Sequence, residues 1–172
     1  MEAKPKFLVP IFLTLLSIPA YGSSVIEGGL GVKLGDSFSG TEIIGNTTGE
    51  VPIYKFSPSK PLPKLDRYGV IVTPKTRKIV EIWAWSVDMG STAACKEQLE
   101  RFEVVFDKKY GGHKSNAITF GENVIYRHLE SKISINCPIS FGSEPLYLQY
   151  SSDAMEKLRL SESVDEEDFG DI

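Results

Sequence analysis

The hydrophobic period of the chain changes twice, and this change restricts the fold more than any other feature. One long segment, residues 89–112, carries apolar residues at helical spacing: Cys95, Leu99, Phe102, Phe106 and Tyr110. On both sides of it, short β-branched and aromatic segments have the period of strands. Strands, one long helix and then strands predict an α+β fold, a mainly antiparallel sheet of about six to eight short strands covered by that helix.

Eight segments have the strand pattern: residues 32–34, 51–56, 68–73, 79–87, 117–120, 123–129, 132–137 and 145–151. Polar turns join the neighbouring segments, so we expect antiparallel pairs. Segment 79–87 is apolar on both faces, which predicts a central strand whose two tryptophans fill the core. Alternation places five of its residues on one face: Ile79, Glu81, Trp83, Trp85 and Val87.

The expected ends of the helices follow from capping residues. Ser91 or Thr92 can cap the start of the long helix, and Gly111 with Gly112 predicts a left-handed stop. After the last strand, Asp153 and Glu156 resemble a capping box. A short C-terminal helix is therefore expected at residues 154–160.

The amino-terminal 22 residues predict export. Lys4 and Lys6 precede twelve apolar residues at 7–18, and small residues follow up to Gly22. This is the layout of a signal peptide that is removed after Gly22. A membrane anchor is the alternative, but it needs about 20 apolar residues, and Pro10 interrupts this shorter segment. We expect a periplasmic or secreted protein without an integral membrane segment after cleavage.

Cys95 and Cys137 are the two cysteines of the chain, and both follow the predicted signal peptide. In an oxidising compartment an even pair usually forms a bridge, so we predict a disulfide between them. Two buried free thiols are the alternative. Neither cysteine belongs to a C-x-x-C motif, so the sequence does not support redox catalysis.

Residues 23–160 are expected to form a single α+β domain, followed by an acidic flexible tail at 161–172. The tail holds six acids and no base. The formal net charge of the whole chain is -4, so the folded body is close to neutral. This balance argues against a nucleic-acid partner, which normally needs a basic face. The tail either aids solubility or covers a basic site.

Residues 34–38, which include Asp36 and Ser37, resemble the first sequence block of the GDSL-type esterases and lipases. The resemblance implies that Ser37 attacks an ester carbonyl. The later blocks of that family are absent, so we interpret the segment as a turn that ends a strand. His113 and His128 have no acidic or thiol companions at ligand spacing, and we expect neither a metal nor a cofactor.

Residues 70–111 contain a strand, the segment Thr73-Pro74-Lys75-Thr76, a second strand and a helix that starts with Cys95 and ends at Gly111. This order resembles small secreted bacterial proteins of unassigned function. The resemblance implies an exported single-domain protein and no particular activity.

The sequence leaves two classes of function open. The first is an exported, non-catalytic binding protein of the bacterial envelope, such as an inhibitor, immunity or accessory protein, whose partner is another protein or an envelope component. The second is a small secreted hydrolase that uses Ser37. For the first class we expect recognition on loops held by a rigid scaffold. The candidates are residues 35–49, with Asp36 and Ser37, and residues 138–144, with Phe141.

Overall fold

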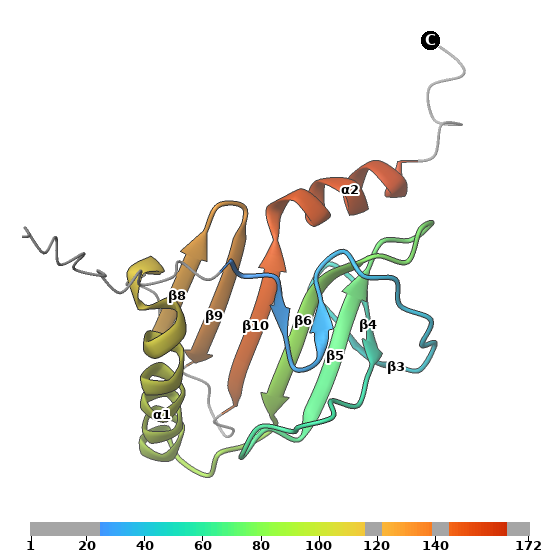
Figure 1. Cartoon of the computed structure of the whole chain (residues 1–172). Coiled ribbons are helices and arrows are strands. Elements are labelled where there is room, and N and C mark those ends of the chain that lie inside the picture. Colours follow the sequence, from blue (N-terminus) through green and yellow to red (C-terminus); the bar gives the residue numbers. More distant parts are fainter. Residues whose placement is uncertain (1–24, 116–121, 139–144, 165–172) are drawn as a thin grey trace, which may run out of the picture.

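The computed structural model describes residues 25–115, 122–138 and 145–164. It is a mixed fold with an eight-stranded antiparallel sheet in the order β3-β4-β5-β6-β10-β9-β8-β7 and two helices (Figure 1). The strands are β3 (Ile43–Asn46), β4 (Pro52–Lys55), β5 (Arg67–Val72), β6 (Ile79–Ser86), β7 (Lys114–Ser115), β8 (Glu122–His128), β9 (Ser131–Cys137) and β10 (Leu146–Ser152). A separate hairpin consists of β1 (Gly28–Gly29) and β2 (Val32–Lys33), and the helices are α1 (Thr92–Tyr110) and α2 (Asp153–Ser163).

The predicted mixed fold with a mainly antiparallel sheet is therefore confirmed. Every strand pair in the described residues is antiparallel, and the β5–β6 hairpin forms where it was expected. Strand β3 was missed, because its Gly-rich surroundings were interpreted as loop. The expected strand 117–120 and the predicted signal peptide, residues 1–22, lie outside the described residues, as does the tail beyond residue 164.

Helix α1 begins as expected, because the hydroxyl of Ser91 accepts a hydrogen bond from the Ala94 N–H. Its apolar stripe is buried against β8 and β9, and the Tyr126 hydroxyl of β8 donates to Asp107 at 2.7 Å. The predicted left-handed stop is wrong. Gly111 has a φ of -56°, and the chain continues into a 3-10 turn, Gly111–His113, that leads directly into β7.

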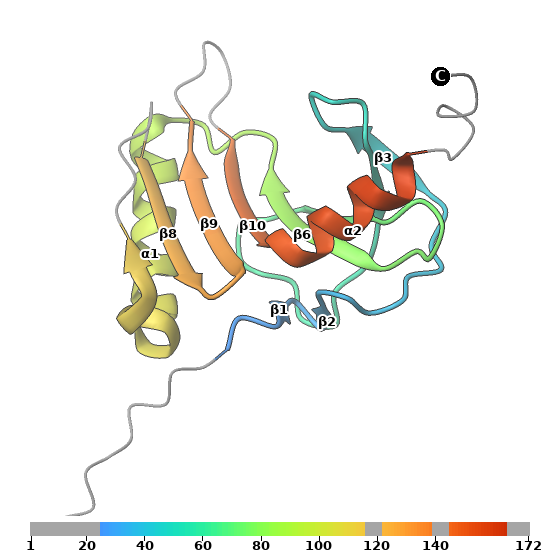
Figure 2. The same ribbon diagram turned by 90° about the horizontal axis from the view of Figure 1, so that it is seen from above.

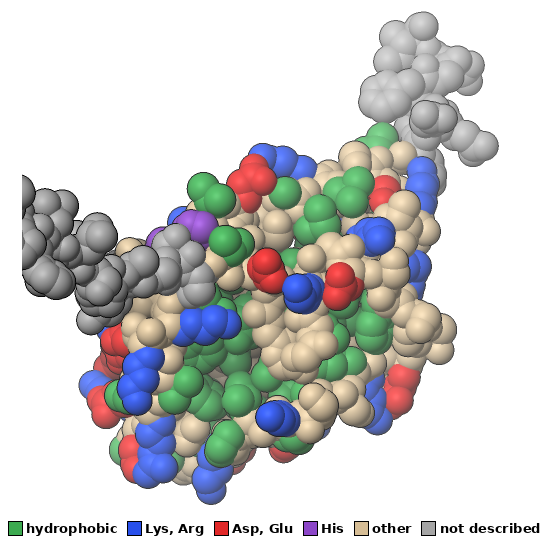
Figure 3. All heavy atoms as spheres, viewed as in Figure 1, with side chains coloured by type: hydrophobic (Ala, Val, Ile, Leu, Met, Phe, Trp, Pro, Cys, Tyr) green, Lys and Arg blue, Asp and Glu red, His purple; other side chains and the backbone are tan. Residues whose placement is uncertain are grey.

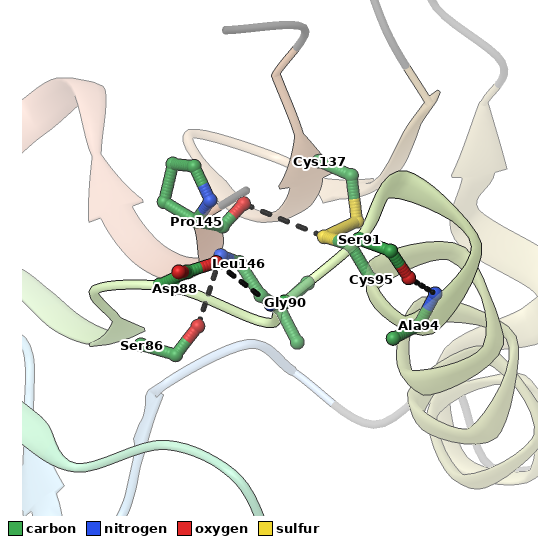
Figure 4. The surroundings of a disulfide bond; sticks show 9 residues. All are labelled: Ser86, Asp88, Gly90, Ser91, Ala94, Cys95, Cys137, Pro145 and Leu146. Atoms are coloured by element: carbon green, nitrogen blue, oxygen red, sulfur yellow. Dashed lines mark hydrogen bonds between the residues drawn. A yellow bond between two sulfur atoms is a disulfide. The ribbon is translucent and has the colours of Figure 1, made fainter. Parts of the chain in front are cut away.

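The predicted disulfide between Cys95 and Cys137 is present, with Cα atoms 6.0 Å apart. It joins the first turn of α1 to the end of β9, and both cysteines are buried (Figure 4). The carbonyl oxygen of Pro145, just before β10, lies 3.4 Å from the Sγ of Cys95. The bridge thus fixes the start of the helix beside the ends of two central strands.

The two faces of the sheet differ because side chains alternate along each strand. On the helix face, which α1 covers in part, the large core includes Val70, Ile82, Ile135 and Leu148. The other face, here called the groove face, has a much smaller cluster of buried hydrophobic residues: Ile53, Ile71 and Val80.

A β-bulge in β6 interrupts the strict alternation of side chains that was expected for residues 79–87. Val72 pairs with Ile79 and Ile71 pairs with Glu81, so Val80 is an extra residue between the two pairs. The bulge puts Ile79 in the helix-face core, away from Trp83. Without it, Ile79 would share the face of the tryptophans, as strict alternation predicts.

Helix α2 crosses one end of the sheet, from β10 towards the β5–β6 turn (Figures 1 and 2). Its cap is Ser152, whose hydroxyl accepts from the Met155 N–H, and not the expected Asp153. The helix extends to Ser163, three residues past its expected end. Glu162, which the sequence assigned to the tail, accepts hydrogen bonds from the backbone N–H groups of Lys75 and Thr76 at 2.8 and 2.9 Å.

Candidate functional site

The groove face carries an open groove of about 700 Å³, which is within the usual size range of small-molecule sites. Strands β6 and β10 supply its aromatic and polar centre, the β3–β4 hairpin one wall, and α2 one end. Two of the lining residues, Ile53 and Ile71, are buried. The lining residues used below as the open surface of the groove are half buried: Glu81, Trp83, Trp85, Pro138, Tyr147, Gln149, Glu156 and Arg159.

The strand register brings the aromatic side chains together. Trp85 pairs directly with Tyr147 of β10, and Trp83 pairs with Gln149. The rings of Trp83 and Tyr147 stand almost perpendicular, at 88°, with centroids 6.3 Å apart. These residues belong to central strands with partners on both sides, so the aromatic surface is held by the rigid part of the fold.

Gly69 of β5 lies opposite Trp83 and keeps this part of the groove face closely packed. A Cβ atom at position 69 would lie 2.3 Å from the Cγ2 atom of Ile53. The missing side chain therefore lets Ile53 pack next to the tryptophan. We expect Gly69→Ala to displace Ile53 and to change the shape of the groove.

Glu81 is the most unusual residue of the groove, a carboxylate in the middle of a central strand. Its Oε2 atom accepts hydrogen bonds from Trp83 Nε1 at 2.7 Å and from Gln149 Nε2 at 2.8 Å. Burial raises the pKa of Glu81, while these two hydrogen bonds oppose the increase. Both donors are neutral, so the negative charge of Glu81 has no directly bonded cation among the described contacts.

At the α2 end of the groove, Arg159 donates two hydrogen bonds to Glu156, from Nε at 2.8 Å and from Nη2 at 2.6 Å. The carboxylates of Glu156 and Glu81 raise the pKa of Arg159, although no hydrogen bond joins Arg159 to Glu81 among the described contacts. Among the described lining residues, the charged ones are Glu81, Glu156 and Arg159, so this part of the lining carries one excess negative charge.

The hydrogen bonds of Glu162 hold the far end of α2 to the β5–β6 turn. Desolvation raises the pKa of Glu162, but the hydrogen bonds from Thr76 and Lys75 outweigh this and lower it overall. No residue of α2 is fully buried. The helix is therefore held beside the groove by polar contacts at its end and by the partly buried Met155, which packs against the cluster of Ile53, Ile71 and Val80.

A second groove, of about 690 Å³, lies on the helix face between α1 and the segment 59–63. Figure 3 shows hydrophobic side chains gathered on this side of the molecule. Its lining includes Phe102, Phe106 and Tyr150, and none of its described lining residues is acidic. The groove on the other face combines apolar surface with convergent polar groups, which is typical of a ligand site, and is the better candidate.

The structure places the predicted site residues away from this groove or outside the described chain. Asp36 and Ser37 are exposed, and Ser37 forms an isolated bridge with Lys78. The Ser37 hydroxyl accepts a hydrogen bond from Lys78 Nζ at 2.9 Å. Phe141 lies outside the described residues, but Pro138, which begins the same expected loop, lines the groove.

The two histidines, far apart in the sequence, are neighbours in the structure. The rings of His113 and His128 have centroids 4.4 Å apart, since the turn after α1 lies beside the end of β8. Among the described residues, no cluster of three or more histidine, cysteine or acidic side chains is arranged to hold a metal ion. No helix in the same residues is long and apolar enough to cross a membrane.

Sequence reasoning missed the groove for two reasons. Trp83 and Trp85 were assigned to the core, yet they are only half buried and line the groove. The signal that was available is Glu81, a charged residue inside an otherwise apolar strand. Its partner Gln149 is 68 positions away, and only the β6–β10 pairing brings the two together.

We compared the chain with protein-family models, with curated proteins and with solved structures, and none of the three comparisons found a match.

Proposed function

We propose that this chain is an exported, non-catalytic binding protein of the cell envelope and that its ligand occupies the groove beside β6 and β10. The observation that carries the proposal is that Trp83, Trp85 and Tyr147 line the same groove of about 700 Å³ as the carboxylate of Glu81, which Trp83 contacts directly. The amino-terminal sequence supports export. An inhibitor, immunity or accessory role fits the same site, with an envelope component as its ligand.

The groove favours binding because its polar atoms hold one another in place. Glu81 is fixed by Trp83 and Gln149, and Arg159 is fixed by Glu156. A ligand that enters meets side chains that are already oriented, which reduces the entropy lost on binding. Aromatic side chains line this groove, and such rings are frequent among the residues that dominate recognition sites.

The test is retention of envelope components on the immobilised chain without residues 1–22. The Trp85→Ala variant should no longer retain a ligand that the native chain retains, because it lacks the indole ring that pairs with Tyr147 in the groove. Val104→Ala is the matched control, since Val104 is exposed on α1 and does not line the groove. Equal retention by the two variants, or retention by neither the native chain nor the control, contradicts the proposal.

The alternative is a small secreted hydrolase, and the contact between Ser37 and Lys78 is the observation that favours it. A serine nucleophile needs a group that accepts its proton and donors that stabilise the oxyanion. In the structure Lys78 donates to the serine, and the pair is exposed. Turnover of a model ester that disappears in Ser37→Ala would support the hydrolase and contradict the binding role.

A further inference from the structure

We propose that the ligand of the groove is a small organic cation, an ammonium group on an apolar stem, with Glu81 as its counter-ion. This inference rests on the binding function proposed above and names the class of ligand. Two features of the groove, its charge and its aromatic surface, point to the same chemistry.

The charge of the groove lining is the first feature. Glu156 is neutralised by two hydrogen bonds from Arg159, whereas Glu81 receives hydrogen bonds only from the neutral groups of Trp83 and Gln149. A carboxylate with limited access to water and no bonded cation is costly unless a positive group approaches it. Lys132 and Arg159 act on Glu81 electrostatically, but no described hydrogen bond joins either of them to it.

The aromatic surface is the second feature. Trp83 lies beside Glu81, and Trp85 and Tyr147 continue the aromatic surface along the same face of β6 and β10. Indole and phenol rings attract cations placed over their faces. The hydrogen bond from Trp83 Nε1 to Glu81 increases the electron density of the indole ring, which strengthens that attraction. A bound ammonium group therefore gains from the ring of Trp83 and from the carboxylate, and its stem extends along the groove over the half-buried Trp85.

The two tryptophans of the chain make the test direct. Trp83 and Trp85 are the only ones in the sequence, and both line the groove, so tryptophan fluorescence reports on this site alone. The probe is choline, and the matched neutral probe is 3,3-dimethylbutan-1-ol, which has the same shape without the charge. We expect saturable fluorescence change with choline and at least tenfold weaker binding of the neutral alcohol.

The matched variants are Glu81→Gln and Val104→Ala. Gln keeps the size and the hydrogen-bond acceptor of Glu81 but removes its charge, so choline should bind at least tenfold more weakly. Val104→Ala, on the exposed side of α1, should bind choline with unchanged affinity. Near-ultraviolet circular dichroism of each variant checks that the fold persists, and the two-probe comparison on the native chain needs no variant.

The outcomes separate this inference from the proposed function. If the neutral alcohol binds as tightly as choline, or if Glu81→Gln has no effect on choline binding, the groove is a site but the cation inference is wrong. If choline does not bind while a groove-dependent envelope ligand is retained, only the cation inference fails. If neither choline nor an envelope ligand depends on the groove, both proposals fail.

Discussion

The two faces of the sheet use the same strands for different purposes. On the helix face, residues such as Ile82 and Leu148 are completely buried, and the disulfide fixes α1 beside them. On the groove face, their neighbours Trp83 and Gln149 remain half buried beside an acidic side chain. Because successive side chains of a strand point to opposite faces, one face can supply stability while the other is left open for a ligand.

The largest expected effect is the loss of stability when a packed aromatic side chain is removed from each face. Phe102→Ala removes a ring that is 5% exposed in the helix-face core and should lower the free energy of unfolding by about 3–5 kcal/mol. Trp85→Ala removes a larger but half-buried side chain from the groove and should lower it by roughly half as much. Urea unfolding measured by far-ultraviolet circular dichroism compares the two. Equal losses would mean that the faces contribute alike to stability.

The disulfide provides a second test of how the helix face and the groove face differ. Replacing both Cys95 and Cys137 by Ser opens a loop with a sequence separation of 42, and should lower the free energy of unfolding by about 4 kcal/mol. The bridge belongs to the helix face, so in the folded double variant the tryptophan emission from the groove should stay unchanged. A shifted emission in the folded variant would show that the disulfide also supports the groove face.

The smallest of the three effects is the pH dependence due to Glu81. Burial raises its pKa above the ordinary 4.5, so the folded chain holds this proton more tightly than the unfolded chain. The associated stability is therefore complete below about pH 4.5 and is lost as the pH rises through the raised pKa. Glu156 adds to the increase, whereas Trp83, Gln149 and Lys132 oppose it.

Unfolding free energies of the native chain and of Glu81→Gln, measured from pH 4 upwards, test this pH dependence. The native chain should lose stability relative to the variant as the pH rises, by less than either effect above. Glu97→Gln is the control, because Glu97 is an exposed carboxylate on α1, paired with Arg101. A constant difference between the native chain and Glu81→Gln at every pH would contradict the raised pKa of Glu81.

Local patterns in the sequence predict the elements that are long or strongly periodic. The stripe from Cys95 to Tyr110 predicts α1, and the β-branched segments predict β5 and β6. The Ser91 cap was also correct, because a cap depends on residues only a few positions apart. Strand β3 was not predicted, since a short strand of four residues that includes Gly45 forms only by pairing with β4.

By itself the sequence determined the period of each element, the pair of cysteines available for the bridge and the presence of Glu81 within an apolar strand. Only the tertiary structure decided which face Ile79 occupies, because a bulge is set by the pairing of two strands. It also decided that Trp83 and Trp85 line a groove, since their exposure depends on whether another element covers that face of the sheet. Helix α2 covers only one end of the groove face, where the hydrogen bonds of Glu162 with Thr76 hold its C-terminal end. The candidate site is therefore a product of long-range pairing and incomplete covering, which a local pattern does not encode.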